Sequence, residues 1–319
     1  MPYHIKPSYL DLDTVVRIDE KWNRLQKKRP LSPTIVSKLK EQFMLEMTYN
    51  SNAIEGNTLN LKETYLIINE GITIKGKSFK EHLEAKSHNE ALEFIYDLIK
   101  FESQPTISEN LIRQIQSLVI SPIDKSIAGI YRTGEVAIAG SNLQTPMAID
   151  VPNLMSKLIT WFSKNQKSLH PIELASIFHY KFVAIHPFID GNGRTARLLM
   201  NIILLKYGYP LVVILKNDRK RYYSALSKAD NGKVVPFVKF MSQSIERSLD
   251  IYIEAVFYTN KINKFMPLSQ ISKKSQFSAK YLNLLARKGK IVAHKKGRIW
   301  FTSLLEIQNY LSKRKRIRK

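Results

Sequence analysis

Apolar residues recur along most of the chain at intervals of three and four positions, which is the period of an α-helix with one buried face. This period predicts an amphipathic helix over Leu12–Gln26 and a longer helix that begins at Ser32-Pro33 and ends at Gly56. Serine followed by proline is a typical helix start, and glycine often supplies the left-handed residue that ends a helix. The same period predicts further helices over 60–71, 78–99, 108–119, 151–163 and 171–184, a helix that ends at Gly208, and helices over 219–228 and 235–257.

Two stretches interrupt the helical pattern. Within residues 129–146, the β-formers Tyr131, Val136 and Ile138 stand among glycines, which favours a short β-hairpin. Residues 211–215 are a short apolar run and are expected to be extended. Before its C-terminal segment, the chain is therefore predicted to be all-α with one short β-hairpin.

The C-terminal segment has a pattern of its own. A polar stretch at 259–267 is expected to be a linker, and helices are predicted from Ser269 and over Ser278–Arg287. The segment should then contain, in order, a strand at Ile291–His294, the basic tip Lys295-Lys296-Gly297, a strand at Arg298–Phe301 and a last helix from Ser303. Two helices followed by a two-stranded wing are typical of a winged helix-turn-helix DNA-binding domain.

These patterns predict how the chain is divided. We expect an N-terminal helical region at 1–100, a helical core at 101–258, the linker at 259–267, the small module at 268–312 and a basic tail at 313–319. The tail is predicted to be disordered, because it consists almost entirely of charged residues.

The composition is that of an ordinary soluble globular protein. The chain has 319 residues, of which 44% are hydrophobic and 24% are charged. No apolar run approaches the roughly 18 to 20 residues that cross a bilayer, and the start of the chain lacks the apolar segment of a signal peptide. Cysteine is absent, which excludes disulfides, thiolate zinc sites and thiol nucleophiles. We therefore expect a cytoplasmic protein without a membrane partner.

The positive charge is concentrated at the C-terminus. The formal net charge is +23, and residues 261–319 contribute +16 of it, with Glu306 as their single acidic residue. A basic module of this kind predicts a polyanionic partner, and its helix pattern indicates DNA. The alternative is a small stabilising or protein-docking domain whose basic face is solvated.

Phosphate chemistry is indicated by the stretch His186–Arg197, which reads HPFIDGNGRTAR and runs into an apolar helix. The triplet Gly191-Asn192-Gly193 can turn successive backbone N–H groups toward one point, because glycine tolerates positive φ and carries no side chain. Such a nest at a helix N-terminus binds phosphate. Arg194 in the first turn adds a forked donor, and Arg197 lies on the same helical face one turn later.

Two residues of this stretch are suited to metal binding and proton transfer. Asp190 precedes the nest and suits a magnesium ion that bridges phosphates, since magnesium takes few carboxylates plus phosphate oxygens. His186, with an ordinary pKa near ~6.5, is a natural base for a hydroxyl. Alone, each would be interpreted as part of a turn or as a packed side chain. Their joint occurrence with two arginines at one loop-to-helix junction favours a polyphosphate site, while Phe188 and Ile189 are expected to be core anchors.

This string resembles, position for position, the His-x-Phe-x-(Asp/Glu)-Gly-Asn-Gly-Arg-x-x-Arg signature of Fic domain proteins. The resemblance extends over about residues 51–249. Members of that family are mostly AMP transferases, which move AMP from ATP to a hydroxyl side chain of a target protein. The resemblance therefore implies the all-α Fic fold with a β-hairpin flap, ATP as substrate and Mg2+ as cofactor.

The resemblance also implies roles for the residues of the string. His186 would be the general base, and Asp190 would be the magnesium ligand. Arg197 would hold the γ-phosphate. The α- and β-phosphates would be bound by Gly191, Asn192, Gly193 and Arg194.

The nucleoside side of the site is implied in the same way. Residues 131–146 resemble the flap hairpin of the family, which registers the target by strand addition and borders the nucleotide. Relatives often carry an asparagine near the adenine, where this chain reads Ala229-Asp230-Asn231, so either Asp230 or Asn231 takes that place. Flap contacts would come from Val136, Ala137, Ile138 and Ala139, and nucleoside contacts from Tyr222 and Tyr223.

An inhibitory element is implied by the stretch Ser51-Asn52-Ala53-Ile54-Glu55-Gly56-Asn57, which resembles the family motif (Ser/Thr)-x-x-x-Glu-(Gly/Asn) in its N-terminal form. It ends the helix predicted at about 33–56, where the macrodipole is negative, so the carboxylate of Glu55 should have an external partner. The family precedent makes that partner Arg197, with Ser51 and Glu55 as the inhibitory residues. The alternative is a solvated glutamate before a C-cap glycine.

We therefore expect a protein adenylyltransferase that transfers AMP from ATP to a Ser, Thr or Tyr hydroxyl of a target protein and is inhibited by Glu55. Some relatives also use this glutamate to remove AMP, so both directions stay open. One alternative is transfer of another phosphate-containing group on the same fold. Another is a DNA-binding regulator with a nucleotide-sensing core. The target, and whether the protein forms a homodimer, also stay open.

Overall fold

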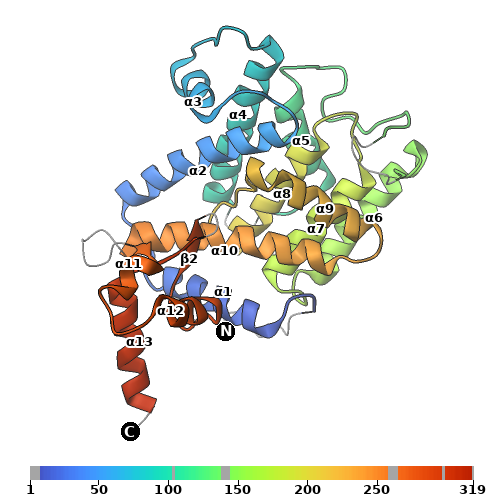
Figure 1. Cartoon of the computed structure of the whole chain (residues 1–319). Coiled ribbons are helices and arrows are strands. Elements are labelled where there is room, and N and C mark those ends of the chain that lie inside the picture. The colour runs from blue at the N-terminus through green and yellow to red at the C-terminus, as the bar shows by residue number, and fades with distance from the viewer. Residues whose placement is uncertain (1–7, 103–104, 138–143, 258–264, 297–298, 318–319) are drawn as a thin grey trace. The chain divides into compact units, whose positions relative to one another are not determined.

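The computed structural model of the protein describes residues 8–102, 105–137, 144–257, 265–296 and 299–317 (Figure 1). Helices account for 67% of the structure, and its strands are short. The prediction of an all-α fold with a small β-hairpin is therefore confirmed. The helices lie within a few residues of the ranges that the apolar period predicted, because that period reports directly which face of a helix is buried.

The chain folds into two compact units. The larger unit consists of Lys38–Ile245 with Tyr3–Leu10, and the smaller unit consists mainly of Asp11–Ser37 with Glu246–Lys319. Two of the dividing points lie inside long helices, α2 (Pro33–Ile54) and α10 (Val235–Phe257). The domain boundaries expected from the sequence stay a prediction.

The larger unit is built around α8 (Asn192–Lys206). This helix packs against α4, α5 and α7, and all of its residues from Arg194 to Leu204 are buried. A helix that is apolar on most sides is typically enclosed by others. The unit also contains α3 (Leu61–Glu70), α4 (Phe79–Phe101), α5 (Glu109–Ile120), η1 (Ala148–Asp150), α6 (Val151–Asn165), α7 (Pro171–Ile185), η2 (Lys216–Asp218) and α9 (Arg219–Asp230).

Local capping residues begin and end several of these helices. At the start of α3, Asn60 Oδ1 accepts from Glu63 N at 2.9 Å and Glu63 Oε2 accepts from Asn60 N at 2.8 Å, which is a capping box. Gly71 ends α3 in the left-handed conformation, with a φ of 66°. Ser78 and Glu81 form a second box at the start of α4. These helix ends are therefore fixed by the local sequence.

The strands expected within 129–146 are absent from its described residues, 129–137 and 144–146. Thr145 Oγ1 donates to Val136 O at 2.7 Å, so a side chain links the two arms there. Residues 211–215 are likewise held by a side chain, since Asn201 donates to Val212 O at 3.0 Å and accepts from Val212 N at 2.7 Å. A strand needs a partner strand, and β-propensity alone does not supply one. The β-hairpin of the described chain lies in the smaller unit.

The smaller unit combines α1 (Leu12–Gln26) and the end of α10 with the C-terminal elements. These are β1 (Met266–Pro267), α11 (Leu268–Ser272), α12 (Ala279–Arg287), β2 (His294–Lys296), β3 (Ile299–Thr302) and α13 (Leu304–Ile317). The prediction of a disordered tail is wrong for residues 313–317, because they continue α13. The strands pair antiparallel in the order β1-β3-β2. Met266 lies opposite Thr302, and Lys295 lies opposite Trp300.

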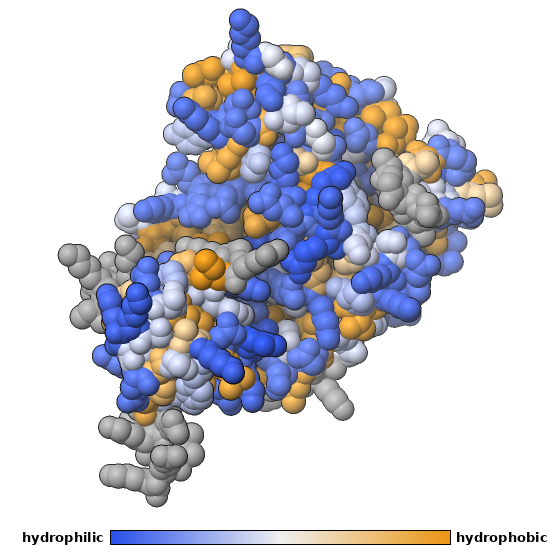
Figure 2. Space-filling view, in the orientation of Figure 1, coloured by the Kyte–Doolittle hydropathy of each residue, from blue (hydrophilic) through white to orange (hydrophobic). Residues whose placement is uncertain are grey.

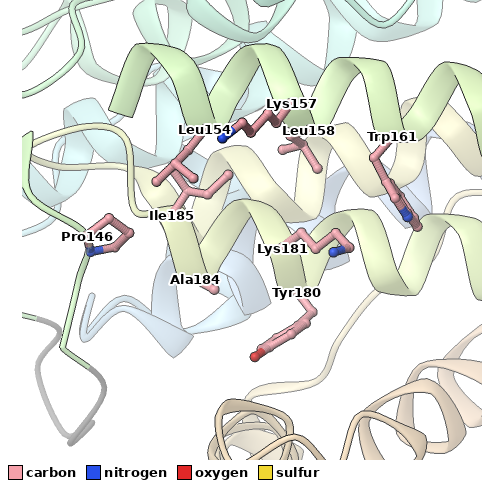
Figure 3. A pocket seen from close by; sticks show the side chains of 9 residues that line it. All are labelled: Pro146, Leu154, Lys157, Leu158, Trp161, Tyr180, Lys181, Ala184 and Ile185. Carbon is pink, nitrogen blue, oxygen red and sulfur yellow. The ribbon is translucent and has the colours of Figure 1, made fainter. Parts of the chain in front are cut away.

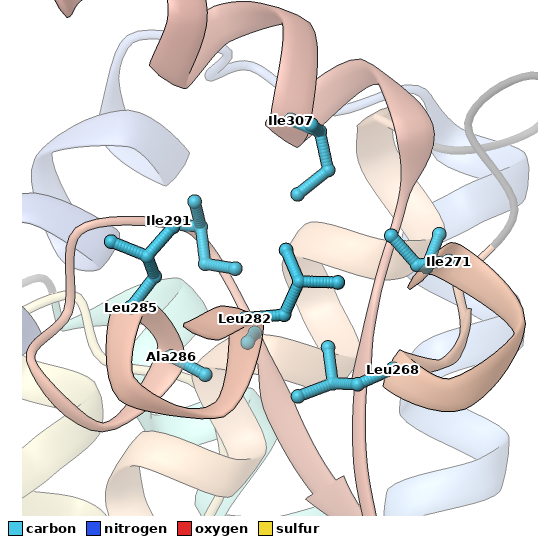
Figure 4. Packing of buried hydrophobic residues seen from close by; sticks show 8 residues of the cluster. Leu268, Ile271, Leu282, Leu285, Ala286, Ile291 and Ile307 are labelled. Carbon is cyan, nitrogen blue, oxygen red and sulfur yellow. The ribbon is translucent and has the colours of Figure 1, made fainter. Parts of the chain in front are cut away.

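An apolar cluster holds α11, α12 and α13 together (Figure 4). The first strand of the hairpin begins at His294 and not at Ile291 as predicted, because Ile291 and Ala293 pack into this cluster. The buried members of the cluster are Leu268, Ile271, Leu282, Leu285, Ala286, Ile291, Ala293 and Ile307.

Buried ion pairs join α1 to α10 within the smaller unit. Lys21 Nζ lies 2.8 Å from Glu246 Oε1 and 2.6 Å from Asp250 Oδ1. Arg17 makes a forked pair with Glu246, at 2.7 and 3.0 Å. The N-terminal helix therefore belongs to the same unit as the C-terminal elements, which the sequence pattern did not predict.

The surface carries scattered apolar side chains. On the face drawn in Figure 2, hydrophilic residues predominate, with hydrophobic patches between them. Among the large hydrophobic residues of the described chain, Ile149 is the most exposed, at 83%. None of the described helices combines the length and the apolarity that a membrane crossing requires.

Candidate active site

His186 ends α7 in a left-handed conformation. Its φ is 51° and its ψ is 59°, and within the described part of the chain no other non-glycine residue has a positive φ. Its backbone N–H donates to Phe182 O at 3.1 Å, which closes the helix. Left-handed non-glycine residues are costly and cluster at functional sites. The chain turns at this residue, and its side chain lines a pocket.

The surroundings of His186 set its protonation. Nδ1 lies 3.3 Å from Val183 O, and because a carbonyl only accepts, Nδ1 carries the hydrogen and Nε2 keeps its lone pair. Burial lowers the pKa of His186 below its ordinary value. The bond to Val183 opposes this effect, and the positive charge of Arg132 adds to it. His186 is therefore neutral at pH 7 and able to accept a proton.

Asn192 fixes the loop between His186 and α8. Its Oδ1 accepts from Phe188 N at 3.0 Å, and its Nδ2 donates to Phe188 O at 2.7 Å. Gly191 has a φ of 82°, and a Cβ there would lie 2.9 Å from the Ile120 side chain, so glycine is required on both counts. Phe188 is buried as predicted, whereas Ile189 is 52% exposed. The prediction that Ile189 is a core anchor is wrong, because the loop turns its side chain to solvent.

Glu55 lies against the N-terminus of α8. A Cβ added to Gly193 would overlap a carboxylate oxygen of Glu55 and would lie 3.3 Å from Arg197 Nη1. Only glycine therefore leaves room for an anion over this first turn. The free N–H groups at the start of a helix and the helix dipole both favour negative charge here. The carboxylate thus occupies the position that the sequence predicted for a phosphate.

Arg197 is the partner of this carboxylate. Its Nη2 lies 2.7 Å from Glu55 Oε1 and 2.8 Å from Ser51 O, and its Nε donates to Ser51 Oγ at 2.9 Å. The Arg197 side chain is 1% exposed and the Glu55 side chain is 33% exposed, so the pair joins a buried cation to the edge of the pocket. The structure brings these three residues together across 142 to 146 positions of sequence.

Arg194 faces two carboxylates. Its Nη2 lies 3.3 Å from Asp190 Oδ1, and its Nη1 lies 3.5 Å from Glu84 Oε1 on α4. The Arg194 side chain is buried, whereas that of Asp190 is 45% exposed and lines the pocket. One exposed carboxylate beside an anion position fits a magnesium ion that takes its other ligands from phosphate and water. No cluster of three or more acidic, histidine or cysteine side chains among the described residues could hold a metal by itself.

Tyr223 lines the pocket, and Tyr222 packs in the core. Tyr222 is 2% exposed, and its hydroxyl lies 2.8 Å from His179 Nε2. Arg219, which sequence reasoning missed, lies 4.8 Å over the Tyr223 ring and donates to Ile54 O at 2.7 Å. Its spacing of four residues from Tyr223 on one helix was the available signal.

The end of α9 carries the two residues considered for adenine contact. Asn231 Nδ2 donates to Ser227 O at 2.7 Å, so its amide is used at the helix end. Burial raises the pKa of Asp230, and Tyr180 Oη donates to the neighbouring Ala229 O at 2.9 Å. Neither Asp230 nor Asn231 lines the pocket. Their contact with a nucleotide stays a prediction.

Arg132 connects the flap segment to His186. Its Nε donates to His186 O at 2.9 Å, and its backbone N–H donates to Pro187 O at 2.9 Å. The same guanidinium donates to Gly134 O at 3.1 Å and to Pro146 O. Its side chain is fully buried. Sequence reasoning placed this arginine at the start of the flap and missed these bonds, because they depend on tertiary contacts.

The pocket itself is small. Its volume is about 210 Å³, below the roughly 300 to 1,000 Å³ of typical ligand sites. Among the predicted flap contacts, Ala137 lines it and Val136 does not, while Ile138 and Ala139 lie outside the described residues. The lining consists of Glu55, Ala137, His186, Ile189, Asp190, Gly191, Asn192, Gly193, Arg194, Arg219 and Tyr223.

The fold and the site together define an all-α protein whose central helix begins at a glycine-containing loop beside a neutral histidine. The Fic/DOC family model matches residues 106–204, which include this loop. A solved Fic domain-containing signaling protein from Bacteroides thetaiotaomicron is 33% identical, with a TM-score of 0.69 and coverage of 76% of this chain and 96% of that chain. The chain belongs to the Fic/DOC family.

Two further relatives are similar over most of the chain. The structure of Fic-1 from C. elegans is 31% identical, with a TM-score of 0.70 and coverage of 77% of this chain and 74% of that chain. Protein adenylyltransferase Fic from Nematostella vectensis is 38% identical over 249 residues, which are 78% of this chain and 57% of that protein. The chain spans about half the length of the curated relatives it matches.

Proposed function

We propose that this protein is an adenylyltransferase, which transfers AMP from ATP to a hydroxyl side chain of a target protein. The observation that carries the proposal is the presence of a neutral histidine base and a helix N-terminal anion position in one pocket. The name of the relative from Nematostella vectensis, protein adenylyltransferase, supports the same activity.

In this reaction the chain supplies a base and phosphate contacts. His186 Nε2 accepts the proton of the target hydroxyl while the hydroxyl oxygen attacks the α-phosphorus of ATP. The bond between the α-phosphorus and the oxygen that bridges to the β-phosphate breaks, and pyrophosphate leaves. Residues 191–194 hold the α- and β-phosphates and stabilise the developing charge, and Arg197 holds the γ-phosphate. Asp190 would bind magnesium, which neutralises phosphate charge when bound.

We infer that Glu55 keeps the protein in a resting state. Its carboxylate lies over Gly193 and pairs with Arg197, and both of these are positions proposed for ATP. ATP must therefore displace Glu55, or bind without its γ-phosphate contact to Arg197. Removal of AMP from a target, with Glu55 positioning a water, is the alternative direction of the reaction.

The test compares AMP transfer by the wild type, Glu55→Gly and Glu55→Gly/His186→Ala. Each full-length protein is incubated with a cell lysate, Mg2+ and ATP labelled at the α-phosphate, and the label in protein is measured. We expect Glu55→Gly to transfer at least about tenfold more AMP than the wild type, which corresponds to about 1.4 kcal/mol. Loss of the base in the double variant should lower the rate by about 100-fold or more.

Controls separate this activity from its alternatives. Glu41→Gly makes the same change at an exposed position of α2 and should leave transfer at the wild-type level. Labelled GTP and CDP-choline are offered to Glu55→Gly in parallel. If protein is labelled from CDP-choline and not from ATP, the proposed activity would be phosphocholine transfer and not AMP transfer. Transfer from none of the donors would reject an enzymatic role for the pocket.

We propose a second function for the C-terminal elements, binding of duplex DNA in the manner of a winged helix. The supporting observation is a set of exposed basic side chains on α12, the turn after it and β2. About five phosphate contacts would give a slope of roughly −4 to −5 for log affinity against log salt. The exposed side chains are Lys280, Arg287, Lys288, Lys290 and Lys295.

DNA binding is tested by the fluorescence anisotropy of a labelled random duplex at increasing salt. Lys280→Glu/Lys288→Glu in the full-length chain should weaken binding and make the salt slope shallower by about two, because two phosphate contacts are lost. Lys80→Glu, at an exposed position of α4, should change neither. Binding that does not depend on salt would favour the protein-docking alternative.

A further inference from the structure

A second hollow in the larger unit shares no lining residue with the pocket of His186. It is a groove of about 470 Å³ between α6 and α7, within the roughly 300 to 1,000 Å³ of typical binding sites. Figure 3 shows the lining side chains of both helices, with Pro146 at one end. The groove is lined by Pro146, Leu154, Lys157, Leu158, Trp161, Tyr180, Lys181, Ala184 and Ile185.

The groove and the segment that leads into it present apolar surface. Just after Pro146, Met147 is 62% exposed and Ile149 is 83% exposed. Lys181 Nζ lies 5.3 Å from the centroid of the Trp161 ring, so its charge rests on an aromatic surface. Exposed apolar side chains next to an apolar groove mark an interaction surface.

The charges of the two helices are positive wherever they reach solvent. The charged residues of α6 are Lys157 and Lys164, and those of α7 are Glu173 and Lys181. Glu173 is fully buried, and its carboxylate accepts backbone N–H bonds from residues 8–10, between 2.7 and 3.1 Å. Along α6 and α7 themselves, only lysines are therefore left to meet a partner, and they are complementary to carboxylates. The exposed Asp150 directly precedes α6, and Asp230 acts on Tyr180, but neither carboxylate lines the groove.

The groove ends next to the proposed base. Ile185 lines it and is followed at once by His186. Pro146, at the same end, accepts a hydrogen bond from Arg132, which also donates to His186 O at 2.9 Å. A polypeptide lying in the groove would therefore continue toward the pocket that His186 lines.

We propose that the groove between α6 and α7 docks a segment of the target protein that carries an apolar or aromatic side chain flanked by acidic residues. The apolar side chain packs against Leu154 and Trp161, the flanking carboxylates pair with Lys157 and Lys181, and the hydroxyl to be modified lies further along the segment. This inference rests on the proposed transfer of AMP to proteins, and it adds the surface that selects the target.

The direct test measures peptide binding without ATP. The probe is a fluorescein-labelled peptide with a central phenylalanine and two aspartates on either side. Its binding to the wild-type protein is measured by fluorescence anisotropy. A second peptide has lysine in place of each aspartate. We expect the acidic peptide to bind, and the basic peptide to bind at least roughly tenfold more weakly. No binding of the acidic peptide, or equal binding of both, overturns the proposal.

Variants locate the binding on the protein. Lys157→Glu/Lys181→Glu should weaken binding of the acidic peptide by roughly tenfold or more and should strengthen binding of the basic peptide, because the local charge is reversed. Lys164→Glu, at an exposed position of α6 outside the groove lining, should bind as the wild type does. Ala184→Leu fills the groove without a change of charge and should also weaken binding. Unchanged binding in both groove variants overturns the proposal.

Failure of docking and failure of the enzyme give different results. In the Glu55→Gly background, Lys157→Glu/Lys181→Glu should lower the labelling of lysate proteins. ATP binding, measured by calorimetry, should stay unchanged. If Glu55→Gly transfers no AMP at all, the proposed function fails, and peptide binding still decides the docking site. Normal labelling by the variant with Lys157→Glu/Lys181→Glu would overturn the proposed docking site, while the proposed AMP transfer would still stand.

Discussion

The carboxylate of Glu55, at the end of α2, lies 2.7 Å from the guanidinium of Arg197, in the second turn of α8. The arginine is buried, and it also bonds to the backbone and hydroxyl of Ser51. A glutamate more than one hundred residues earlier in the chain therefore pairs with a buried cation of α8, the helix that follows the Gly191-Asn192-Gly193 loop.

Glu55→Gln keeps the size of the side chain and removes its charge. Arg197 is then left without an anionic partner, and we expect the free energy of unfolding to fall by about 1–3 kcal/mol. Added MgATP should raise the melting temperature of the variant more than that of the wild type, because its phosphates supply the missing charge. Glu41→Gln on the same helix is the control. Equal shifts with MgATP in Glu55→Gln and wild type would contradict the proposed overlap.

Gly193→Ala tests whether Glu55 and phosphate share one position. The added Cβ would overlap the place where the Glu55 carboxylate now lies. In the Glu55→Gly background, we expect it to weaken ATP binding by roughly tenfold or more, or about 1.4 kcal/mol, as measured by calorimetry. Ser163→Ala, at an exposed position of α6 outside the pocket, is the control. Undiminished ATP binding by Gly193→Ala would place the phosphates elsewhere.

The pH dependence of transfer should follow His186. Burial lowers the pKa of His186 below its ordinary value of 6.5, and the reaction needs the neutral form, so the rate should be constant above about pH 7 and should fall only below 6.5. The negative charge of Glu55 raises the pKa of His186, so its loss in Glu55→Gly lowers that pKa further. The pH–rate profile of Glu55→Gly measures this. An acid limb centred above 6.5 would be incompatible with His186 as the base.

Arg132→Lys tests a positioning role. Lysine keeps the charge but loses the planar fork that donates to His186 O, Gly134 O and Pro146 O. In the Glu55→Gly background, we expect kcat to fall by about tenfold to 100-fold while KM for ATP stays the same, because misplacement of the base affects the transition state. Arg113→Lys, which changes an arginine 4.1 Å from the Tyr131 ring, is the control. A change in KM alone would assign Arg132 to nucleotide binding.

Lys21→Met tests the ion pairs of the smaller unit. Glu246 and Asp250 would be left buried without their shared cation, and we expect the free energy of unfolding to fall by about 3–5 kcal/mol. Lys21→Met/Asp250→Leu should recover much of this loss, since an apolar pair replaces an uncompensated charge. Urea unfolding of the full-length chain measures both, with the exposed Lys27→Met as control. A loss below about 1 kcal/mol for Lys21→Met would show that the pairs behave as if solvated.

The sequence alone determined what depends on neighbouring residues. Helix positions followed from the apolar period, and the ends of α3 from Asn60, Glu63 and Gly71, because capping acts within one turn. The site loop was also predictable, since its glycines, acid, histidine and arginines lie within one continuous stretch. The motif that contains Ser51 and Glu55 was visible by resemblance for the same reason.

The tertiary structure decided what depends on residues distant in the chain. The seating of Glu55 over Gly193, the bonds of Arg132 and the burial of Tyr222 each require a second element in a particular place. Residues with β-propensity in the flap segment lack a strand partner in the part that is described, and the loop exposes the apolar Ile189. The groove between α6 and α7 exists only because two helices pack together. Sequence pattern fixes which face of a helix is buried, and packing alone fixes which side chains then meet.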